Sequence, residues 1–210
     1  MPYLAFRFGH RGQIKSQEGS LKKLVIAVAA MSAFAGSAHA QDASSDAFTG
    51  ARVEARIGWE TPTVSGDGDV YKLGQAVSFG AEAGYDFKLG STVTFGPYAT
   101  FETSGVKACD AGDCLRVKSN IAGGGQVGVA VSDNAMIYGK LGYSQIRMSA
   151  NSGNLSSSEN FGGVGGALGV EFGVTEKAYA RIEGGYSDYG NIYGINFQRR
   201  FFGGSLGYRF

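Results

Sequence analysis

The sequence predicts an all-β fold, an eight-stranded antiparallel up-and-down transmembrane β-barrel. Three observations support this prediction. Apolar and polar residues alternate along eight separate stretches, the connections between these stretches alternate between short and long, and no apolar run beyond the N-terminal region approaches the ~18 to 20 residues of a membrane-spanning helix. A chain that crosses a membrane without helices must cross it with strands that close into a barrel.

Residues 1–40 have the layout of a secretory signal peptide. Two lysines precede an apolar run over 24–35, and the small residues Ala38 and Ala40 follow immediately before Gln41. Basic residues, an apolar core and a small-residue site in this order predict cleavage before Gln41.

The mature chain is then 41–210, a single barrel domain. A signal peptide normally begins near its basic residues, so we interpret 1–20 as a misassigned translation start, with an unusually long basic region as the alternative.

The whole chain has a formal net charge of only +1. No basic patch for nucleic acid is indicated, and we expect no nucleic-acid partner.

The first four predicted strands show a two-residue period. In 50–60, charged residues recur at every second position from Arg52, and apolar residues fill the places between them. The same period continues over 75–89, from 92 to about 103, and over 115–131. Successive side chains of a strand point to opposite faces, so each stretch has one apolar and one polar face.

The last four strands follow the same rule over 135–148, 161–174, 178–187 and 195–210. In the final stretch, one face carries Phe202, Leu206, Tyr208 and Phe210, and the other carries Ser205, Gly207 and Arg209. The sequence therefore provides eight strands, an even number that can close into an antiparallel barrel.

The connections alternate in length along the chain. Short turns are expected at 90–91, 132–134 and 175–177, and long polar loops at 61–74, 103–114, 149–160 and 188–194. Bacterial outer-membrane barrels have this rhythm, with short periplasmic turns and longer outer loops. The pattern predicts that both termini are periplasmic and that the long loops are exposed outside the cell.

Charged residues of both signs recur on one face of strand after strand. In a membrane barrel the apolar face meets lipid, so this charged face is predicted to line the lumen. An eight-stranded barrel is only wide enough to be filled by side chains, and opposite charges are expected to pair there. The predicted lumen charge network is Arg52, Glu54, Arg56, Glu82, Asp86, Lys88, Glu102, Arg116, Lys118, Lys140, Glu171, Arg181 and Glu183.

The C-terminal "GGSLGYRF" carries a family resemblance. Phe202, Leu206, Tyr208 and the terminal Phe210 resemble the β-signal that delivers outer-membrane proteins to the barrel-assembly machinery. The chain over 41–210 is similar to the small eight-stranded outer-membrane barrels, namely the opacity-protein-like family and, more distantly, the OmpA transmembrane domain and OmpX. The resemblance implies a Gram-negative outer membrane, with its lipid and lipopolysaccharide around the barrel.

The residues that commonly carry chemistry are scarce. Both histidines precede Gln41, so the mature chain lacks the commonest general base and metal ligand. We expect no enzymatic activity, no cofactor and no metal. Cys109 and Cys114 fall in one predicted loop, and in an oxidising periplasm they are expected to form a disulfide.

The sequence therefore favours a non-enzymatic outer-membrane barrel whose loops serve a structural, adhesive or surface-antigen role, with a host or surface ligand at the loops. Two alternatives remain. A narrow gated pore would use exchange between lumen arginines and glutamates to admit small solutes or ions. A soluble lipocalin-like barrel would instead bury the apolar faces around a binding cavity.

Overall fold

The computed structural model describes residues 44–210 except 67–68, 73, 111–112, 153–154 and 193–194. Its elements are a 3-10 helix η1 (Ser45–Phe48) and the strands β1 (Gly50–Gly66), β2 (Asp69–Lys72), β3 (Ala76–Lys88), β4 (Val93–Ser104), β5 (Lys107–Asp110), β6 (Asp113–Ser132), β7 (Ala135–Ser152), β8 (Leu155–Gly173), β9 (Ala178–Ile192) and β10 (Ile195–Arg209). The predicted leader 1–40 and its cleavage positions Ala38, Ala40 and Gln41 lie outside the described residues.

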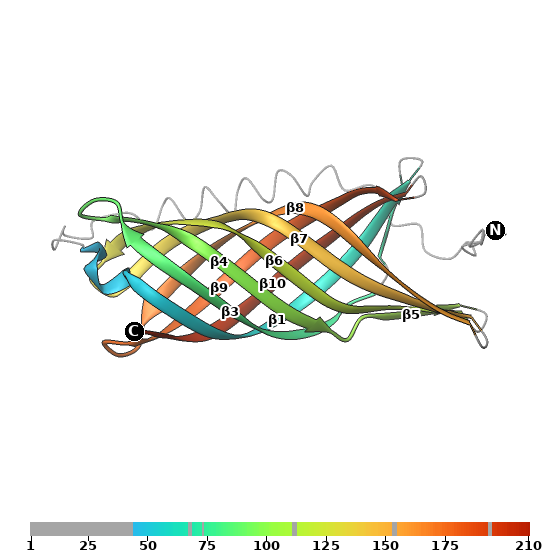
Figure 1. The fold of residues 1–210 in the computed structure, drawn as a ribbon, viewed down its shortest axis with the longest axis horizontal. Helices are drawn as coiled ribbons and strands as arrows, with labels where there is room; N and C mark the ends of the chain where they lie inside the picture. Colours follow the sequence, from blue (N-terminus) through green and yellow to red (C-terminus); the bar gives the residue numbers. More distant parts are fainter. Residues whose placement is uncertain (1–43, 67–68, 73, 111–112, 153–154, 193–194) are drawn as a thin grey trace. The chain divides into compact units, whose positions relative to one another are not determined.

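The strands form a closed antiparallel barrel. Neighbours in the chain pair with one another in the order β1, β3, β4, β6, β7, β8, β9 and β10, and β10 returns to pair with β1. The closing register runs from Arg52 opposite Arg209 to Ser65 opposite Asn196. The predicted eight-stranded up-and-down barrel is therefore confirmed (Figure 1).

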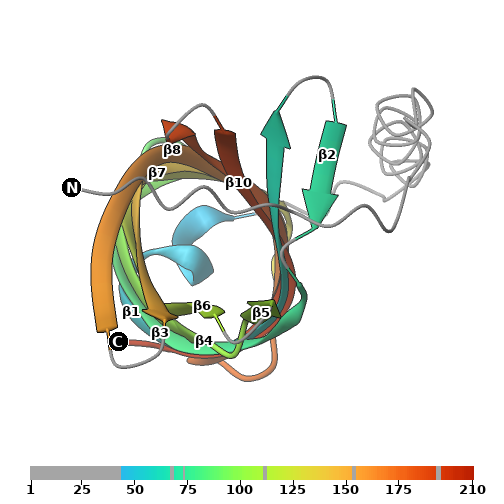
Figure 2. The same cartoon turned by 90° about the vertical axis from the view of Figure 1, so that its right-hand side faces the viewer.

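Short turns gather at one end of the barrel, which we call the turn end. The connections at 89–92, 133–134 and 174–177 lie there, together with η1 and the C-terminus (Figure 1). Viewed along the barrel from the opposite end, η1 lies inside the ring of strands (Figure 2). Its carbonyl at Phe48 accepts a 2.5 Å hydrogen bond from Arg209, so the last strand holds this helix in place.

The opposite end, here called the extension end, differs from the sequence prediction. The stretches predicted as long loops are largely strand, because β1, β6, β7, β8 and β9 continue beyond the predicted boundaries. The short strands β2 and β5 add to β1 and β6 in the same region. Backbone hydrogen bonds to the neighbouring strands hold these extensions, and inward side chains such as Tyr189 and Phe197 pack together between them. The prediction of loops at 61–74, 103–114, 149–160 and 188–194 was therefore wrong where these residues form strand.

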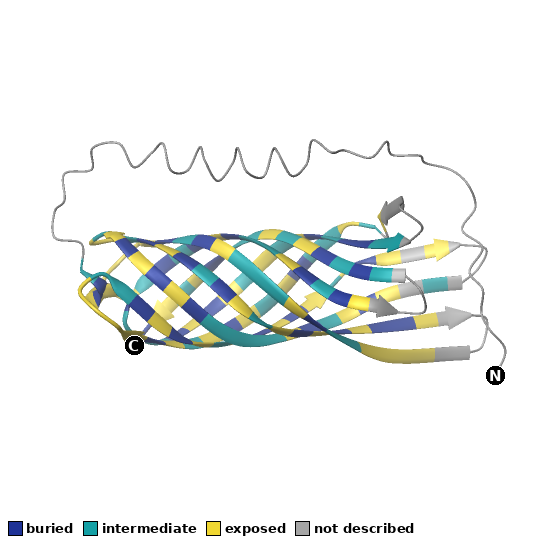
Figure 3. Cartoon of the chain, turned by 90° about the horizontal axis from the view of Figure 1, so that it is seen from above, coloured by how far each residue is buried: buried dark blue, intermediate teal, exposed yellow. Residues whose placement is uncertain are grey.

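Apolar side chains cover the outside of the barrel wall. Exposed residues include Trp59, Leu168 and Phe202, whereas charged side chains such as Arg52 and Glu82 are buried. Buried and exposed residues therefore alternate along each strand (Figure 3). This arrangement contradicts the soluble lipocalin-like alternative, which requires an apolar interior.

Glycines on the inner face provide room for large side chains. A Cβ atom on Gly207 would lie 2.2 Å from the ring of Tyr179, and one on Gly84 would lie 2.8 Å from the guanidinium of Arg52. Both distances are shorter than any side-chain contact allows. A side chain at either position would therefore have to displace Tyr179 or Arg52 from its place in the lumen.

Candidate functional site

Ionised side chains fill the lumen between the two ends of the barrel. The basic ones are Arg52, Arg56, Lys140, Arg181, Arg199 and Arg209, and the acidic ones are Glu54, Glu60, Glu82, Asp86, Glu102, Glu171 and Glu183. Their side chains are at most 10% exposed. Such burial is tolerable only because each charge has partners of opposite sign.

Arg52 is the centre of the layer nearest the turn end. Its guanidinium donates hydrogen bonds to Glu54 at 2.5 Å, to Glu82 at 2.8 Å and to Asp86 at 2.9 Å. A fourth bond, of 3.1 Å, goes to the side-chain oxygen of Gln126. Four acceptors leave little freedom for this side chain, so Arg52 holds β1, β3 and β6 together across the lumen.

Arg181 and Arg209 complete this layer. Arg181 lies 2.7 Å from Glu54 and 2.5 Å from Glu171. Arg209 contacts Glu171 at 2.9 Å and Asp86 at 3.0 Å. Arg209, the last residue of β10, is thereby bonded to β3 and β8 as well as to η1.

The next layer is centred on Glu82 and Glu183. Arg56 contacts both carboxylates at 2.8 Å, and Lys140 contacts them at 2.8 Å and 2.6 Å respectively. The ammonium of Lys140 also lies 5.2 Å from the ring centres of Tyr98 and Tyr138, a cation–π arrangement. Two cations shared between two carboxylates cross-link β1, β3, β7 and β9.

Arg199 forms the layer nearest the extension end. Its guanidinium lies 2.5 Å from Glu60 and 2.7 Å from Glu102. Glu102 also accepts a 3.3 Å hydrogen bond from Arg56, which joins this layer to the one before. The described ion pairs therefore run continuously along the barrel.

Apolar clusters cover both ends of the charge network. At the turn end, Phe48 of η1 packs with Ala130, Met136 and Tyr138, which we call the turn-end cluster. At the other end, the extension-end cluster consists of Val106, Val117, Ile146, Met148, Tyr189 and Phe197. Both clusters add buried apolar contacts to the ion pairs of the lumen.

A small cavity lies within the charged layers. Its volume is about 40 Å³, and its lining includes Arg56, Glu82, Lys140 and Glu183. A polar space of this size holds about three water molecules. This volume is too small to hold a substrate beside the ion pairs.

Three predicted lumen residues lie outside the lumen. Lys88 is exposed at the turn end and pairs with Asp46, whose pKa it lowers through a hydrogen bond. Arg116 and Lys118 are exposed because a register shift between Val117 and Ser119 reverses the phase of β6, so that Val117 turns inward. The alternation rule assumes an unbroken strand, and a β-bulge breaks that assumption.

Three lumen charges were absent from the predicted network. Glu60 and Arg209 stand in phase with inward residues of their strands, so the alternation could have identified them. Arg199 also stands in phase with the inward residues Ser205 and Arg209 of β10, and the register shift of this strand, between Asn196 and Gln198, lies before it. The alternation could therefore have identified Arg199 as well.

The C-terminal residues of the predicted β-signal lie on the outer face. Phe202, Leu206, Tyr208 and Phe210 are all exposed, and Tyr208 and Phe210 contact one another edge to face. The backbone N–H of Phe210 donates a hydrogen bond to the carbonyl of Ala51. These residues are thus positioned for lipid contact beside the seam between β10 and β1.

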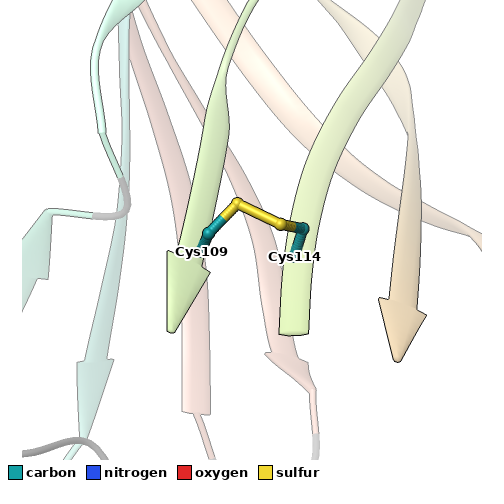
Figure 4. The surroundings of a disulfide bond; sticks show 2 residues. All are labelled: Cys109 and Cys114. Atoms are coloured by element: carbon teal, nitrogen blue, oxygen red, sulfur yellow. A yellow bond between two sulfur atoms is a disulfide. The ribbon is translucent and has the colours of Figure 1, made fainter. Parts of the chain in front are cut away.

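The predicted disulfide between Cys109 and Cys114 is present. The two residues stand opposite each other in the β5–β6 ladder, at the tip of the extension end (Figure 4). The bond joins neighbouring strands and closes a loop of only five residues' separation. Its stabilising effect is therefore local to this hairpin.

A closed barrel with an apolar outer wall and a charged, filled interior is a transmembrane β-barrel. The described residues contain no helix with the length and hydrophobicity needed to cross a membrane. The family model "Outer membrane protein beta-barrel domain" matches residues 26–210, and the chain belongs to this family. Membership places the protein in the outer membrane.

Solved structures share the fold at low sequence identity. Neisserial surface protein A is 17% identical, with a TM-score of 0.52 over 75% of this chain and 97% of that protein. Ail, the attachment invasion locus protein of Yersinia pestis, in complex with the heparin analogue sucrose octasulfate, is 15% identical, with a TM-score of 0.50 over 76% of this chain and 99% of that protein. No curated protein sequence matches the chain significantly.

Proposed function

We propose that the protein is a closed, non-enzymatic barrel that displays its extension end on the cell surface as an adhesive or antigenic structure. The observation that carries this proposal is the filled lumen. Ion pairs span the charged layers, and an apolar cluster covers each end. The carboxylates are held by guanidinium or ammonium groups rather than facing a substrate cleft, which argues against acid–base catalysis in the lumen.

The first test is electrical. We expect the refolded protein in a planar lipid bilayer to show no stepwise conductance at neutral pH, because opening a path would require breaking several buried ion pairs together. Stable, discrete conductance steps would instead support the gated-pore alternative. The empty bilayer and a known large porin provide the baseline and the positive control.

The second test concerns orientation, with the turn end and both termini proposed to be periplasmic. In a background with Cys109 and Cys114 changed to serine, Ser157→Cys places a thiol at the extension end and Asn134→Cys places one at the turn end. We expect a membrane-impermeant thiol reagent to label the first variant on intact cells and the second only after the outer membrane is disrupted. The reverse pattern would refute the orientation.

A group of exposed cations supports the adhesive role. Lys107, Arg116, Lys118 and Arg147 are exposed on β5, β6 and β7, where Lys107 stands opposite Arg116 and Arg147 stands opposite Ser119. Among the described side chains, none of the four forms an ion pair. We call them the basic patch, and we propose that it binds sulfated or phosphorylated glycans, as the complex of Ail with a sulfated sugar suggests for a barrel of similar fold.

The patch is tested with sucrose octasulfate and heparin. We expect the double variant Arg116→Ser/Lys118→Ser to bind more weakly, with a smaller dependence of affinity on salt, because each lost cation removes a charge contact. Arg200→Ser is the matched control, since Arg200 is an exposed cation on β10 across the barrel. Equal loss in both variants would mean that general charge, and not the patch, attracts the glycan.

We propose that the C-terminal strand is the signal by which the barrel-assembly machinery recognises the chain. Its alternating Phe202, Leu206, Tyr208 and Phe210 support this role because they form an apolar row at the closing seam. Outer-membrane lipid and lipopolysaccharide are the proposed surroundings of the apolar wall.

A further inference from the structure

The basic patch includes a strand that is paired on one side only. Within the described residues, β5 pairs with β6 and with no other strand, from Lys107 opposite Arg116 to Asp110 opposite Asp113. Over the same stretch β6 also pairs with β7, where Arg116 stands opposite Ser149. β6 is therefore held from two sides, whereas β5 is held by four residue pairs. We call the paired residues of β5 and β6 the tip hairpin.

The base of the tip hairpin is anchored in the barrel. Val106 directly precedes β5 and is buried in the extension-end cluster. Its carbonyl accepts a 3.1 Å hydrogen bond from the backbone N–H of Val117, a residue that also belongs to this cluster. The next described side chains of β5, those of Lys107 and Cys109, are both exposed. Apolar packing therefore fixes β5 at its base, whereas these two side chains extend into solvent.

Like charges meet in the first residue pair of the tip hairpin. Lys107 stands directly opposite Arg116, and both side chains are exposed. Like charges placed opposite each other in an antiparallel ladder repel and destabilise the pairing. The same closeness gathers these two cations into the basic patch. The charge that suits the patch for an anionic ligand therefore also acts to separate β5 from β6.

The disulfide opposes this separation. Cys109 and Cys114 stand opposite each other, two residues beyond Lys107 and Arg116. Side chains two residues apart lie on the same face of a strand, so the disulfide and the two cations share one face of the hairpin. The bond spans the two strands in Figure 4. A covalent link at this position limits how far the neighbouring like-charged pair can move apart.

The disulfide is accessible to thiols in solution. Cys109 is exposed and Cys114 is half-buried, and exposed disulfides are the more readily reduced ones. A dithiol reductant attacks the Sγ of Cys109 with one thiolate, the S–S bond breaks, and its electron pair stays on the Sγ of Cys114, which takes up a proton. The second thiolate of the reductant then displaces the Cys109 thiolate, which is also protonated. Both cysteines end reduced, and the reductant ends as a disulfide.

We infer that the Cys109–Cys114 disulfide is a redox-sensitive clamp that holds Lys107 beside Arg116 for the binding of sulfated glycans. In the oxidised protein, the tip hairpin presents the cations of both strands to one ligand. After reduction, charge repulsion separates β5 from β6, and Lys107 leaves the basic patch. The clamp rests on the proposed glycan binding of the basic patch and, in the cell, on the proposed surface exposure of the extension end.

The first test measures the clamp without a glycan, in purified, refolded protein in detergent. We expect the backbone amides of 107–110 to exchange with solvent about tenfold faster after reduction with dithiothreitol. The amides of 120–126 provide an internal control, because this part of β6 pairs with β4 and β7 in the barrel wall. Unchanged exchange at 107–110, or equal acceleration at 120–126, would overturn the inference.

The second test measures the affinity for sucrose octasulfate. We expect reduction to weaken binding about threefold, roughly the loss of one exposed charge contact. The double variant Cys109→Ser/Cys114→Ser should have the weaker affinity with or without dithiothreitol. Equal affinity of the oxidised and the reduced protein would overturn the clamp and leave the glycan site in place. No binding by the oxidised protein would refute the glycan site itself, and the proposed role of the clamp with it.

A third variant, Lys107→Ser, separates the positioning of this lysine from a general loosening of the tip hairpin. The oxidised variant should bind sucrose octasulfate about threefold more weakly than the native protein, and reduction should have no further effect. Arg200→Ser, which removes an exposed cation from β10, should respond to reduction as the native protein does. A further loss of affinity when Lys107→Ser is reduced would show that the disulfide does not act through Lys107, and would overturn the inference.

Discussion

Replacing Arg52 with methionine is expected to lower the free energy of unfolding by about 3 to 5 kcal/mol. Arg52 is fully buried and bonds Glu54, Glu82 and Asp86. Its removal leaves three carboxylates with fewer partners in a space that water barely reaches. The measurement is a urea titration of the protein in lipid vesicles, followed by tryptophan fluorescence of Trp59.

Two further variants give this prediction its specificity. Lys88→Met removes a cation that is exposed and paired with exposed Asp46, so little change is expected. Asp86→Asn combined with Arg52→Met should cost less than the sum of the two single changes, because the double variant removes both partners of one buried pair. Strict additivity would mean that solvent already screens these charges, which would favour a wet lumen and the pore alternative.

The faces of the strands could be predicted because the barrel wall has one apolar and one polar side. Glu54, Glu82 and Glu183 alternate with lipid-facing residues, so a two-residue period places them in the lumen. The rule fails at Arg116 and Lys118, where a bulge shifts the phase. No local sequence pattern predicts that shift, because it arises from the pairing of β6 with β7.

The partners within the lumen could not be predicted for a different reason. Arg56 bonds Glu183 across a sequence separation of 127 residues. Which side chains meet across a barrel depends on the tilt and stagger of all its strands together, and alternation along single strands does not contain this information. The turn-end cluster could likewise not be predicted, because Phe48 belongs to a short helix outside every alternating stretch.

Changing Phe210 is expected to reduce insertion in cells several-fold without preventing folding of the purified barrel. Phe210 is exposed on the outer face, and its backbone N–H bonds Ala51 of β1. Deleting the residue removes both features, whereas Phe210→Ala removes only the ring, so a similar loss in both variants assigns the effect to the ring.

The matched control is Phe172→Ala, which removes an exposed ring from β8 near the same end of the barrel. If the C-terminal row is read by the assembly machinery, Phe210→Ala lowers the amount of inserted protein and Phe172→Ala does not. Both purified variants should still refold in detergent into a species with heat-modifiable mobility, since the closing pairs between β1 and β10 remain. Both variants keep the seam between β1 and β10 closed, so neither leaves unpaired backbone groups in the hydrocarbon core. Equal insertion of the two variants would therefore show that Phe210 acts only as one more lipid-facing ring.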